Sequence, residues 1–199
     1  MGKSRFALEA ARNQLEQFAD GVYVASLAPV SEAGRLVPSI AAAVGFQFHT
    51  DERSPDQQLS DYLSRKQMLL LLDNFEHVLE GVDLVQELLG AGPSLRILAT
   101  SRERLHLSGE TIYRLNSLKF PTWETPKQAL QYSAIQLFVQ TARRVRPEFE
   151  PGASEIQYVA RICRLVGGMP LGIILAGSWV SVLSPAEIAE ELTRGFDFL

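Results

Sequence analysis

The sequence predicts an α/β fold built on a parallel sheet, followed by a small unit made only of helices. Residues 69–72 are consecutive leucines that end at Asp73, and so short an apolar run suits a strand covered on both faces. Strand and helix patterns alternate up to about residue 120, whereas only helical patterns follow. We therefore expect an α/β domain over residues 1–120 and a helical subdomain over residues 121–199.

Periodicity and turn residues predict each element in order. Apolar residues at helical spacing predict helices in the first domain over about residues 4–19, 31–44, 56–66 and 75–90. Apolar and β-branched runs predict strands over residues 22–27, 69–72, 95–100 and 111–115. Breaks at glycine and proline separate the helices of the subdomain, over residues 124–145, 153–166, 170–183 and 185–193.

Composition narrows the function classes. The 199 residues are 46% hydrophobic and carry a net charge of −4, which suits a globular core and argues against direct nucleic-acid binding. Arg143, Arg144 and Arg146 are expected to end a helix rather than form a DNA-binding patch. Cys163 is the only cysteine, so an internal disulfide is excluded and a reducing, cytoplasmic location is expected. No stretch is long and apolar enough to suggest a membrane span.

Asp73 is the first candidate site residue. It ends the leucine run, and ligands of open α/β sheets bind at the carboxyl ends of strands. This is the form of a Walker B segment, whose aspartate helps to hold Mg²⁺ beside a nucleotide phosphate. The alternative is that Asp73 or Asn74 caps the following helix, with Glu76 in its first turn.

Gly2, Lys3 and Ser4 form the second candidate site. They match the end of the phosphate-binding motif G-x-x-x-x-G-K-[ST], in which lysine reaches the phosphates and the hydroxyl binds Mg²⁺. A helix should follow, with its amino end pointed at the phosphates. The alternative is an ordinary polar amino terminus.

Arg102 and Pro170 complete the candidates. Arg102 follows the strand over residues 95–100, and its alternative role is that of a surface arginine ending a strand. Pro170 follows Gly167 and Gly168, a pattern that also fits a helix stop and a proline-led helix start.

Taken together, these segments resemble the signal-transduction ATPases with numerous domains (STAND), a group that includes NB-ARC proteins and bacterial transcriptional-regulator-type ATPases. The resemblance covers essentially the whole chain. The matching segments are G-K-S-R-F-A-L-E-A-A at residues 2–11, D-N-F-E-H at residues 73–77, T-S-R at residues 100–102 and G-M-P-L at residues 168–171.

The resemblance implies a P-loop NTPase fold that binds ATP or ADP with Mg²⁺. It implies that Lys3 and Ser4 meet the phosphates, that Ser4 and Asp73 hold the metal, and that Arg102 detects the γ-phosphate. Pro170 would touch the adenine side of the nucleotide. Relatives of this kind continue into a winged helix and often a repeat array, and some form oligomers, so we expect a fragment of a larger regulator.

Two departures from the family pattern matter. Asn74 replaces the second acidic residue found in many relatives, and an amide cannot act as a general base, so hydrolysis would be slow or would rely on Glu76. The motif's first positions and the strand before them are also missing from the sequence. Because that strand lies between the sensor strand and the last strand in relatives, we expect residues 95–100 and 111–115 to form no regular ladder with each other.

Two functions remain open at this stage. The first is a nucleotide-binding switch module with slow or no hydrolysis, a possible ATPase impaired by the incomplete loop. The second is a vestigial interaction domain that keeps the fold but binds no nucleotide. The 199-residue chain is expected to bind ATP poorly, because most backbone N–H groups of a phosphate loop would precede Gly2.

Overall fold

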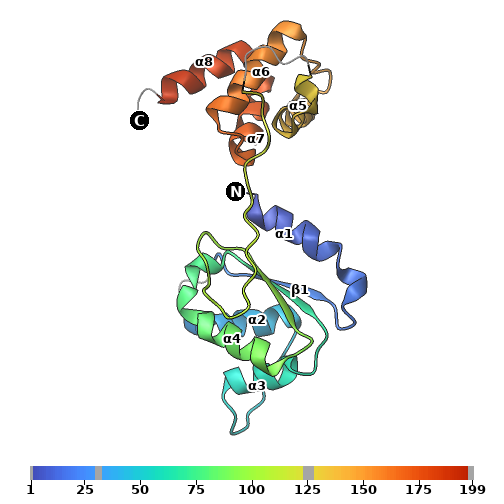
Figure 1. The fold of residues 1–199 in the computed structure, drawn as a ribbon, viewed down its shortest axis with the longest axis vertical. Coiled ribbons are helices and arrows are strands. Elements are labelled where there is room, and N and C mark those ends of the chain that lie inside the picture. Colours follow the sequence, from blue (N-terminus) through green and yellow to red (C-terminus); the bar gives the residue numbers. More distant parts are fainter. Residues whose placement is uncertain (1, 30–32, 123–127, 197–199) are drawn as a thin grey trace. The chain divides into compact units, whose positions relative to one another are not determined.

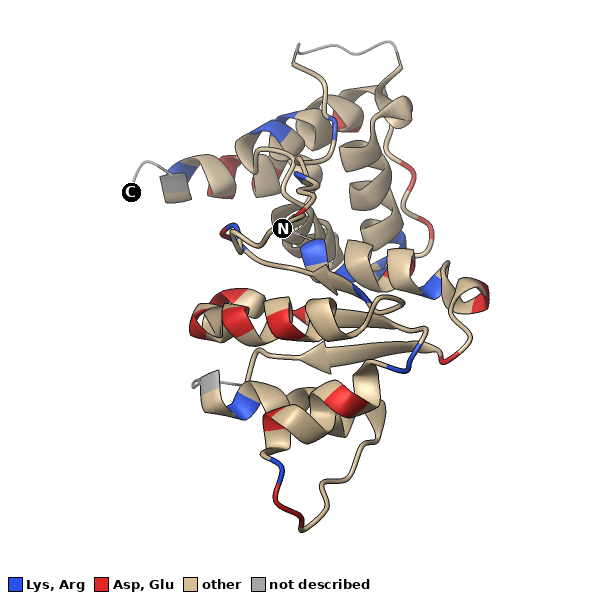
Figure 2. Ribbon diagram, turned by 60° about the horizontal axis from the view of Figure 1, so that its bottom comes forward, with Lys and Arg blue, Asp and Glu red and all other residues tan. Residues whose placement is uncertain are grey.

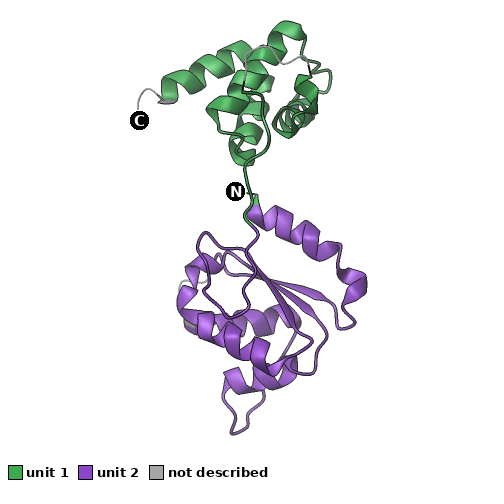
Figure 3. Cartoon of the chain, in the orientation of Figure 1, with its two compact units in different colours: residues 1–2, 114–199 green, residues 3–113 purple. Residues whose placement is uncertain are grey.

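The computed structural model describes residues 2–29, 33–122 and 128–196, and the chain divides into two compact units. One unit is residues 3–113, and the other comprises residues 1–2 and 114–199 (Figure 3). The first is the α/β unit and the second the helical unit. Each is described by itself below.

A parallel sheet forms the centre of the α/β unit (Figure 1). Its strands are β1 (Val22–Ser26), β2 (Leu69–Asp73) and β3 (Arg96–Ala99), in the order β1-β2-β3. Both pairings are parallel, so all three carboxyl ends lie at one edge of the sheet. The α/β prediction with a parallel sheet is confirmed.

Helices cover both faces of this sheet. Helix α1 (Lys3–Arg12) covers one face, and α2 (Leu36–Val44), α3 (Pro55–Leu63) and α4 (Val82–Ala91) lie on the other (Figure 1). Short 3₁₀ turns lie between these elements, at Leu15–Gln17, Ala33–Arg35, Phe75–His77 and Leu79–Gly81. The unit therefore has three layers, with β2 in the middle.

The leucine run of β2 explains why two faces are covered. Side chains alternate along a strand, so Leu69 and Leu71 pack with Ala7 and Ala11 of α1. Leu70 and Leu72 point the other way, into the larger core under α2, α3 and α4. Burying a leucine stabilises the fold by roughly 1.5–3 kcal/mol, so this run is the main anchor of the unit.

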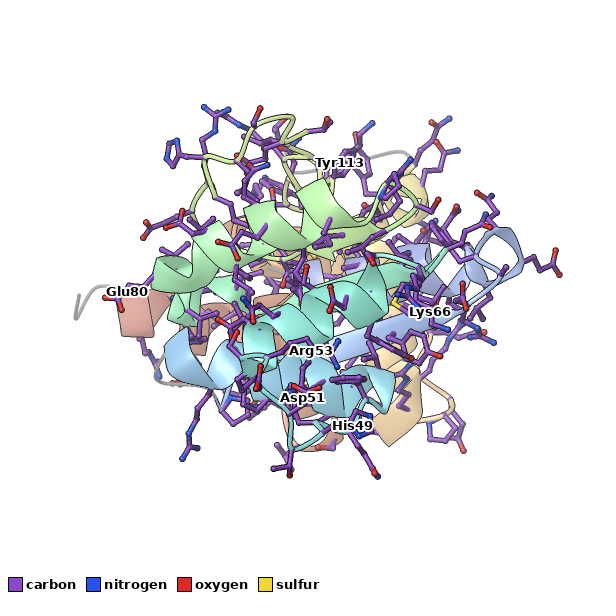
Figure 4. The ribbon with its side chains drawn as sticks, turned by 90° about the horizontal axis from the view of Figure 1, so that it is seen from below. His49, Asp51, Arg53, Lys66, Glu80 and Tyr113 are labelled. Carbon is purple, nitrogen blue, oxygen red and sulfur yellow. The ribbon has the colours of Figure 1, made fainter. Side chains whose placement is uncertain are left out.

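The loop before α3 is fixed by a buried glutamine. The Gln58 side chain is only 4% exposed. Its Nε2 donates to the carbonyl oxygens of His49 and Arg53, and its Oε1 accepts from the backbone N–H of His49. Asp51 and Arg53 form an ion pair on the same loop (Figure 4). Ser54 then caps α3 by accepting from the backbone N–H of Gln57.

The predicted strand over residues 111–115 was wrong, because these residues form no strand. A strand needs a neighbour for its backbone groups, and within the described residues β3 pairs only with β2. The aromatic rings of Tyr113 and Phe6 stack instead, with centroids 5.4 Å apart. The prediction that residues 95–100 and 111–115 form no ladder is confirmed.

Two predicted helices are shorter than expected. The first ends at Arg12 rather than near residue 19. The helix predicted over residues 75–90 begins with two 3₁₀ turns, and α4 starts only at Val82. The interruption falls at Val78, whose φ of −136° is outside the helical range.

The helical unit contains α5 (Ser133–Val145), α6 (Ala153–Leu165), α7 (Pro170–Ser178) and α8 (Pro185–Phe196). Short 3₁₀ turns lie at Ala129–Gln131 and Trp179–Ser181. Residues 124–127, where the first helix was predicted to begin, lie outside the described residues. Helices α5 and α7 pack closely, since a Cβ at Gly177 would lie 3.0 Å from the Cβ of Thr141.

Charge is distributed over both units without one dominant sign. Lysines and arginines are interspersed with aspartates and glutamates along the ribbon (Figure 2). Within the described ranges, no helix is long and apolar enough to cross a membrane.

Candidate functional site

The candidate site lies at the carboxyl ends of β2 and β3, where Thr100 fixes Asp73. The register pairs Leu72 with Ala99, so Asp73 and Thr100 are the next residues on neighbouring strands. The hydroxyl of Thr100 donates to Oδ1 of Asp73 and accepts from the backbone N–H of Asn74 (2.9 Å). Thr100 is only 5% exposed. A buried hydroxyl with two partners holds the Asp73 carboxylate in one orientation at this edge.

The backbone of Thr100 closes the same corner. Its N–H donates to the carbonyl oxygen of Leu72, and its carbonyl oxygen accepts from the N–H of Phe75, each at 2.9 Å. Phe75 is fully buried in the larger core. The end of β2 is therefore bound to β3 by both backbone and side chain.

Asn74 turns the chain sharply after β2. Its φ is 64° and ψ 43°, in the left-handed region, which asparagine adopts more readily than most other residues. No side-chain cap of the following turn is formed by Asn74, so the capping alternative is not what the structure shows for this residue. The left-handed backbone conformation therefore explains an asparagine at position 74 by itself, whether or not the residue takes part in hydrolysis.

Glu76, which follows β2, and Arg102, which follows β3, form an ion pair. The Nε atom of Arg102 lies 3.2 Å from Oε1 of Glu76. The Glu76 side chain is 10% exposed and that of Arg102 79% exposed. The second oxygen of Glu76, Oε2, is buried and has no hydrogen-bond partner in the described part of the chain. Within the ranges that the structure describes, this nearly buried carboxylate thus has one partner, through one of its two oxygens.

The amino end of α1 points toward the same edge of the sheet. The segment after α1 is tied to the start of β2, since the N–H of Asp20 donates to the carbonyl oxygen of Gln67 and the N–H of Gln67 to Oδ2 of Asp20. Helix α1 therefore runs antiparallel to the strands. Its first residues, Lys3 and Ser4, are half-buried, and neither side chain has a hydrogen bond or ion pair within the described ranges.

A metal ion would find few protein ligands here. Among the described residues, no group of three or more His, Cys, Asp or Glu side chains could hold a metal. Mg²⁺ at a nucleotide keeps several waters and takes one or two protein oxygens together with phosphate oxygens. Among the candidate residues, Asp73 carries a carboxylate and Ser4 a hydroxyl.

Pro170 and Gly2 belong to the helical unit, apart from the residues above. Pro170 is the first residue of α7, as the pattern of a helix stop and a proline-led start predicts. Gly167 and Gly168 before it both have positive φ, of 59° and 66°. Gly2 also has a positive φ, of 75°. Of the candidate residues, Lys3, Ser4, Asp73, Glu76 and Arg102 lie in the α/β unit, together with Thr100.

Sequence reasoning missed two features of this site. The first is the role of Thr100, which was noted only as a neighbour of Arg102. A buried threonine next to the end of a central strand is a signal for it, but only once the strand register is known. The second is the burial of Glu76, which follows from the left-handed turn at Asn74 and has no signature in the spacing of charged residues.

Comparison with known proteins finds long relatives. The chain is 37% identical over 200 residues to proteins of Mycobacterium bovis and Mycobacterium tuberculosis that are provisionally named HTH-type transcriptional regulators. The match includes 100% of this chain but only 21% of those proteins. The chain thus spans about a fifth of their length.

A second group of relatives is shorter. An uncharacterized protein of Mycobacterium tuberculosis is 35% identical over 197 residues, which is 98% of this chain and 47% of that protein. No protein-family model matches the chain. Similarity to these proteins therefore extends over the α/β unit and the helical unit alike.

Proposed function

We propose that this chain is the nucleotide-binding switch module of a signal-transduction or transcription-regulator ATPase of the STAND type, with a P-loop NTPase fold. The observation that carries the proposal is the fixed position of Asp73 at the carboxyl end of the central strand, held by Thr100. Parallel α/β sheets bind ligands at this edge. Arg102, Lys3 and Ser4 add cations and a hydroxyl toward the same edge.

Each residue has a role in this proposal. Lys3 neutralises phosphate charge at the amino end of α1, where backbone N–H groups and the helix dipole also favour an anion. Asp73 and Ser4 hold Mg²⁺, which would draw charge from the β- and γ-phosphates when bound. Arg102, with an exposed guanidinium, contacts the γ-phosphate.

Hydrolysis by this site is slow or absent. Asn74 cannot accept a proton from water at neutral pH, and its left-handed backbone suits a turn residue. Glu76 is the acidic side chain that pairs with Arg102, so it is already engaged by that arginine. Slow turnover suits a switch, because a switch needs two long-lived nucleotide states.

The relatives support the regulatory setting. Their names describe transcriptional regulators, and the chain spans only part of them. In this proposal the module acts in the cytoplasm and conveys its nucleotide state to neighbouring domains, such as a winged helix and a repeat array, without binding DNA itself. An oligomer is a further part of the proposal, since many switches of this class signal by assembling.

Thermal-shift titration tests the proposal. A ligand that binds only the folded state raises the melting temperature by mass action, so MgATP and MgADP should each raise it for the wild-type chain at sufficiently high concentration. Asp73→Asn should reduce the shift, and Glu103→Gln, an exposed neighbour of Arg102, should not. Equal shifts for wild type and Asp73→Asn would contradict the assigned role of Asp73.

The second candidate function is a vestigial interaction domain with the same fold. The observation that favours it is the Glu76–Arg102 pair, because a carboxylate already neutralises the arginine proposed to detect phosphate. In that case neither nucleotide should shift the melting temperature at any concentration, and Asp73→Asn should change only stability.

A further inference from the structure

The two partners of the Glu76–Arg102 ion pair differ in exposure to solvent, and this difference affects which ligand Arg102 can bind. Glu76 is nearly buried, whereas Arg102 is 79% exposed. A guanidinium carries five N–H donors, yet the one contact of Arg102 in the described part of the chain joins Nε to Oε1 of Glu76. Most of its donors are free to meet a second anion.

Glu76 depends on Arg102 more than Arg102 depends on Glu76. Its Oε2 is buried without a partner among the described residues, so the carboxylate has lost hydration and gained one contact in return. A buried charge without a counter-ion is strongly unfavourable. Arg102, by contrast, would be well hydrated on its own. Moving Arg102 away therefore costs free energy mainly at Glu76.

We propose that Glu76 is a specificity-determining residue, an internal anion that competes with the terminal phosphate of a nucleoside triphosphate for Arg102. This inference rests on the proposed function and assigns a role within the same site. A phosphate offers more charge and more oxygens than the single oxygen Oε1, and guanidinium binds phosphate through two parallel hydrogen bonds. A diphosphate lacks the group that competes.

The competition sets how strongly the site distinguishes ATP from ADP. Binding of a γ-phosphate by Arg102 is weakened by the free energy of the Glu76 contact, whereas binding of a diphosphate that does not recruit Arg102 is not. Glu76 thus raises the concentration of nucleoside triphosphate that is needed to occupy the site. Residue 76 would act through Arg102 and not by touching the nucleotide.

The test is an NMR titration of the 199-residue chain, because NMR detects weak binding. Wild type, Glu76→Gln and Arg102→Gln are titrated with MgATP and MgADP, and the Nε–H signal of Arg102 is followed. Glu103→Gln is the matched control, since it removes one negative charge from an exposed neighbour. Glutamine keeps the size of the glutamate side chain, so Glu76→Gln and Glu103→Gln retain the local packing. Arg102→Gln shortens a side chain that is 79% exposed.

We expect Glu76→Gln to tighten MgATP binding about three- to fivefold, the upper part of the range for a partly exposed ion pair. MgADP binding should change less than about twofold, within the scatter expected for a residue without direct contact. In the ligand-free wild type the Arg102 Nε–H signal should differ from that in Glu76→Gln, and MgATP should shift it. Glu103→Gln should match wild type, and Arg102→Gln should remove the preference between the nucleotides.

Two failures are distinguishable. If wild type binds both nucleotides and Glu76→Gln changes their affinities equally, or weakens MgATP, the competition is wrong and the proposed function survives. If neither wild type nor any variant binds either nucleotide, the proposed function is wrong, and so is the proposed competition for Arg102.

Discussion

Thr100 is the residue on which the geometry of the candidate site most directly depends. Its hydroxyl joins Oδ1 of Asp73 to the backbone N–H of Asn74. Both bonds are shielded by the burial of Thr100. A donor or acceptor left unpaired in such a place costs about 1–3 kcal/mol.

Replacing Thr100 with valine tests this. Valine keeps the shape and removes the hydroxyl, so Thr100→Val should lower the free energy of unfolding by about 1–3 kcal/mol. Thr100→Ser is the control: it keeps the hydroxyl and removes one methyl, which should cost about 1 kcal/mol. Urea denaturation measures both. An unchanged free energy of unfolding in Thr100→Val would show that the hydroxyl bonds contribute nothing to stability.

Cys163 gives a prediction about pH. Burial raises the pKa of its thiol to about 12 from 9.0. The folded chain therefore keeps this proton at pH values where the unfolded chain loses it, so the contribution of Cys163 to stability is complete below about pH 9 and declines as pH rises toward about 12.

The comparison with Cys163→Ala isolates this contribution. The fall in the free energy of unfolding above about pH 9 should be steeper in wild type than in the variant. In the folded protein the thiol should also resist alkylation until urea unfolds the chain, because only the thiolate reacts. Rapid alkylation under native conditions would contradict the burial of Cys163.

At the scale of elements, the turn between α6 and α7 is the most constrained junction. Gly168 has a φ of 66°, and a Cβ there would lie 2.3 Å from the carbonyl oxygen of Leu118. The carbonyl oxygen of Gly168 also accepts from the N–H of Leu118 (2.9 Å). Gly167 has a similar φ, of 59°, but open space around its Cα.

These two glycines form a matched pair for mutation. Gly167→Ala should cost roughly 1 kcal/mol, the penalty of a left-handed backbone for alanine. Gly168→Ala should cost that amount and also displace Leu118, for a total of about 2–4 kcal/mol. Thermal unfolding of the two variants measures the difference. Similar losses of stability would mean that the backbone at Leu118 moves away from the added methyl group without a measurable cost in free energy.

Elements with a regular pattern of apolar residues could be predicted from the sequence. Elements that depend on pairing with another part of the chain could not. The leucine run predicted β2, its two covered faces and the place of Asp73, because burial on both sides leaves a direct mark on composition. Residues 111–115 have the composition of a strand, yet they form none, because no strand among the described residues pairs with them. Strand pairing is a property of the sheet and is not encoded in one segment.

The candidate site shows the same division. Asp73 and Arg102 could be found from their positions after strands. The clamp by Thr100 depends on the register between β2 and β3, and the burial of Glu76 depends on the left-handed turn at Asn74. These relations join residues of different elements, so spacing along the chain does not reveal them.

For the whole molecule, the question is whether the charges at the carboxyl edge of the sheet serve a nucleotide. Lys3 and Ser4 match the last two positions of the phosphate-binding motif G-x-x-x-x-G-K-[ST]. In such loops the backbone N–H groups before these two positions make most of the phosphate contacts. Under the proposed function, affinity for ATP should therefore rise steeply in a chain that supplies those groups.

Calorimetry with MgATP tests this central claim most directly. The 199-residue chain is compared with a longer chain that adds an upstream strand and the residues that complete a G-x-G-G-M-G-K-S loop, alone and with Lys3→Ala or Asp73→Asn. We expect weak binding by the 199-residue chain, clear binding by the longer chain, and loss of that binding in both variants. Absence of binding by the longer chain, or binding that survives Lys3→Ala and Asp73→Asn, would contradict the account.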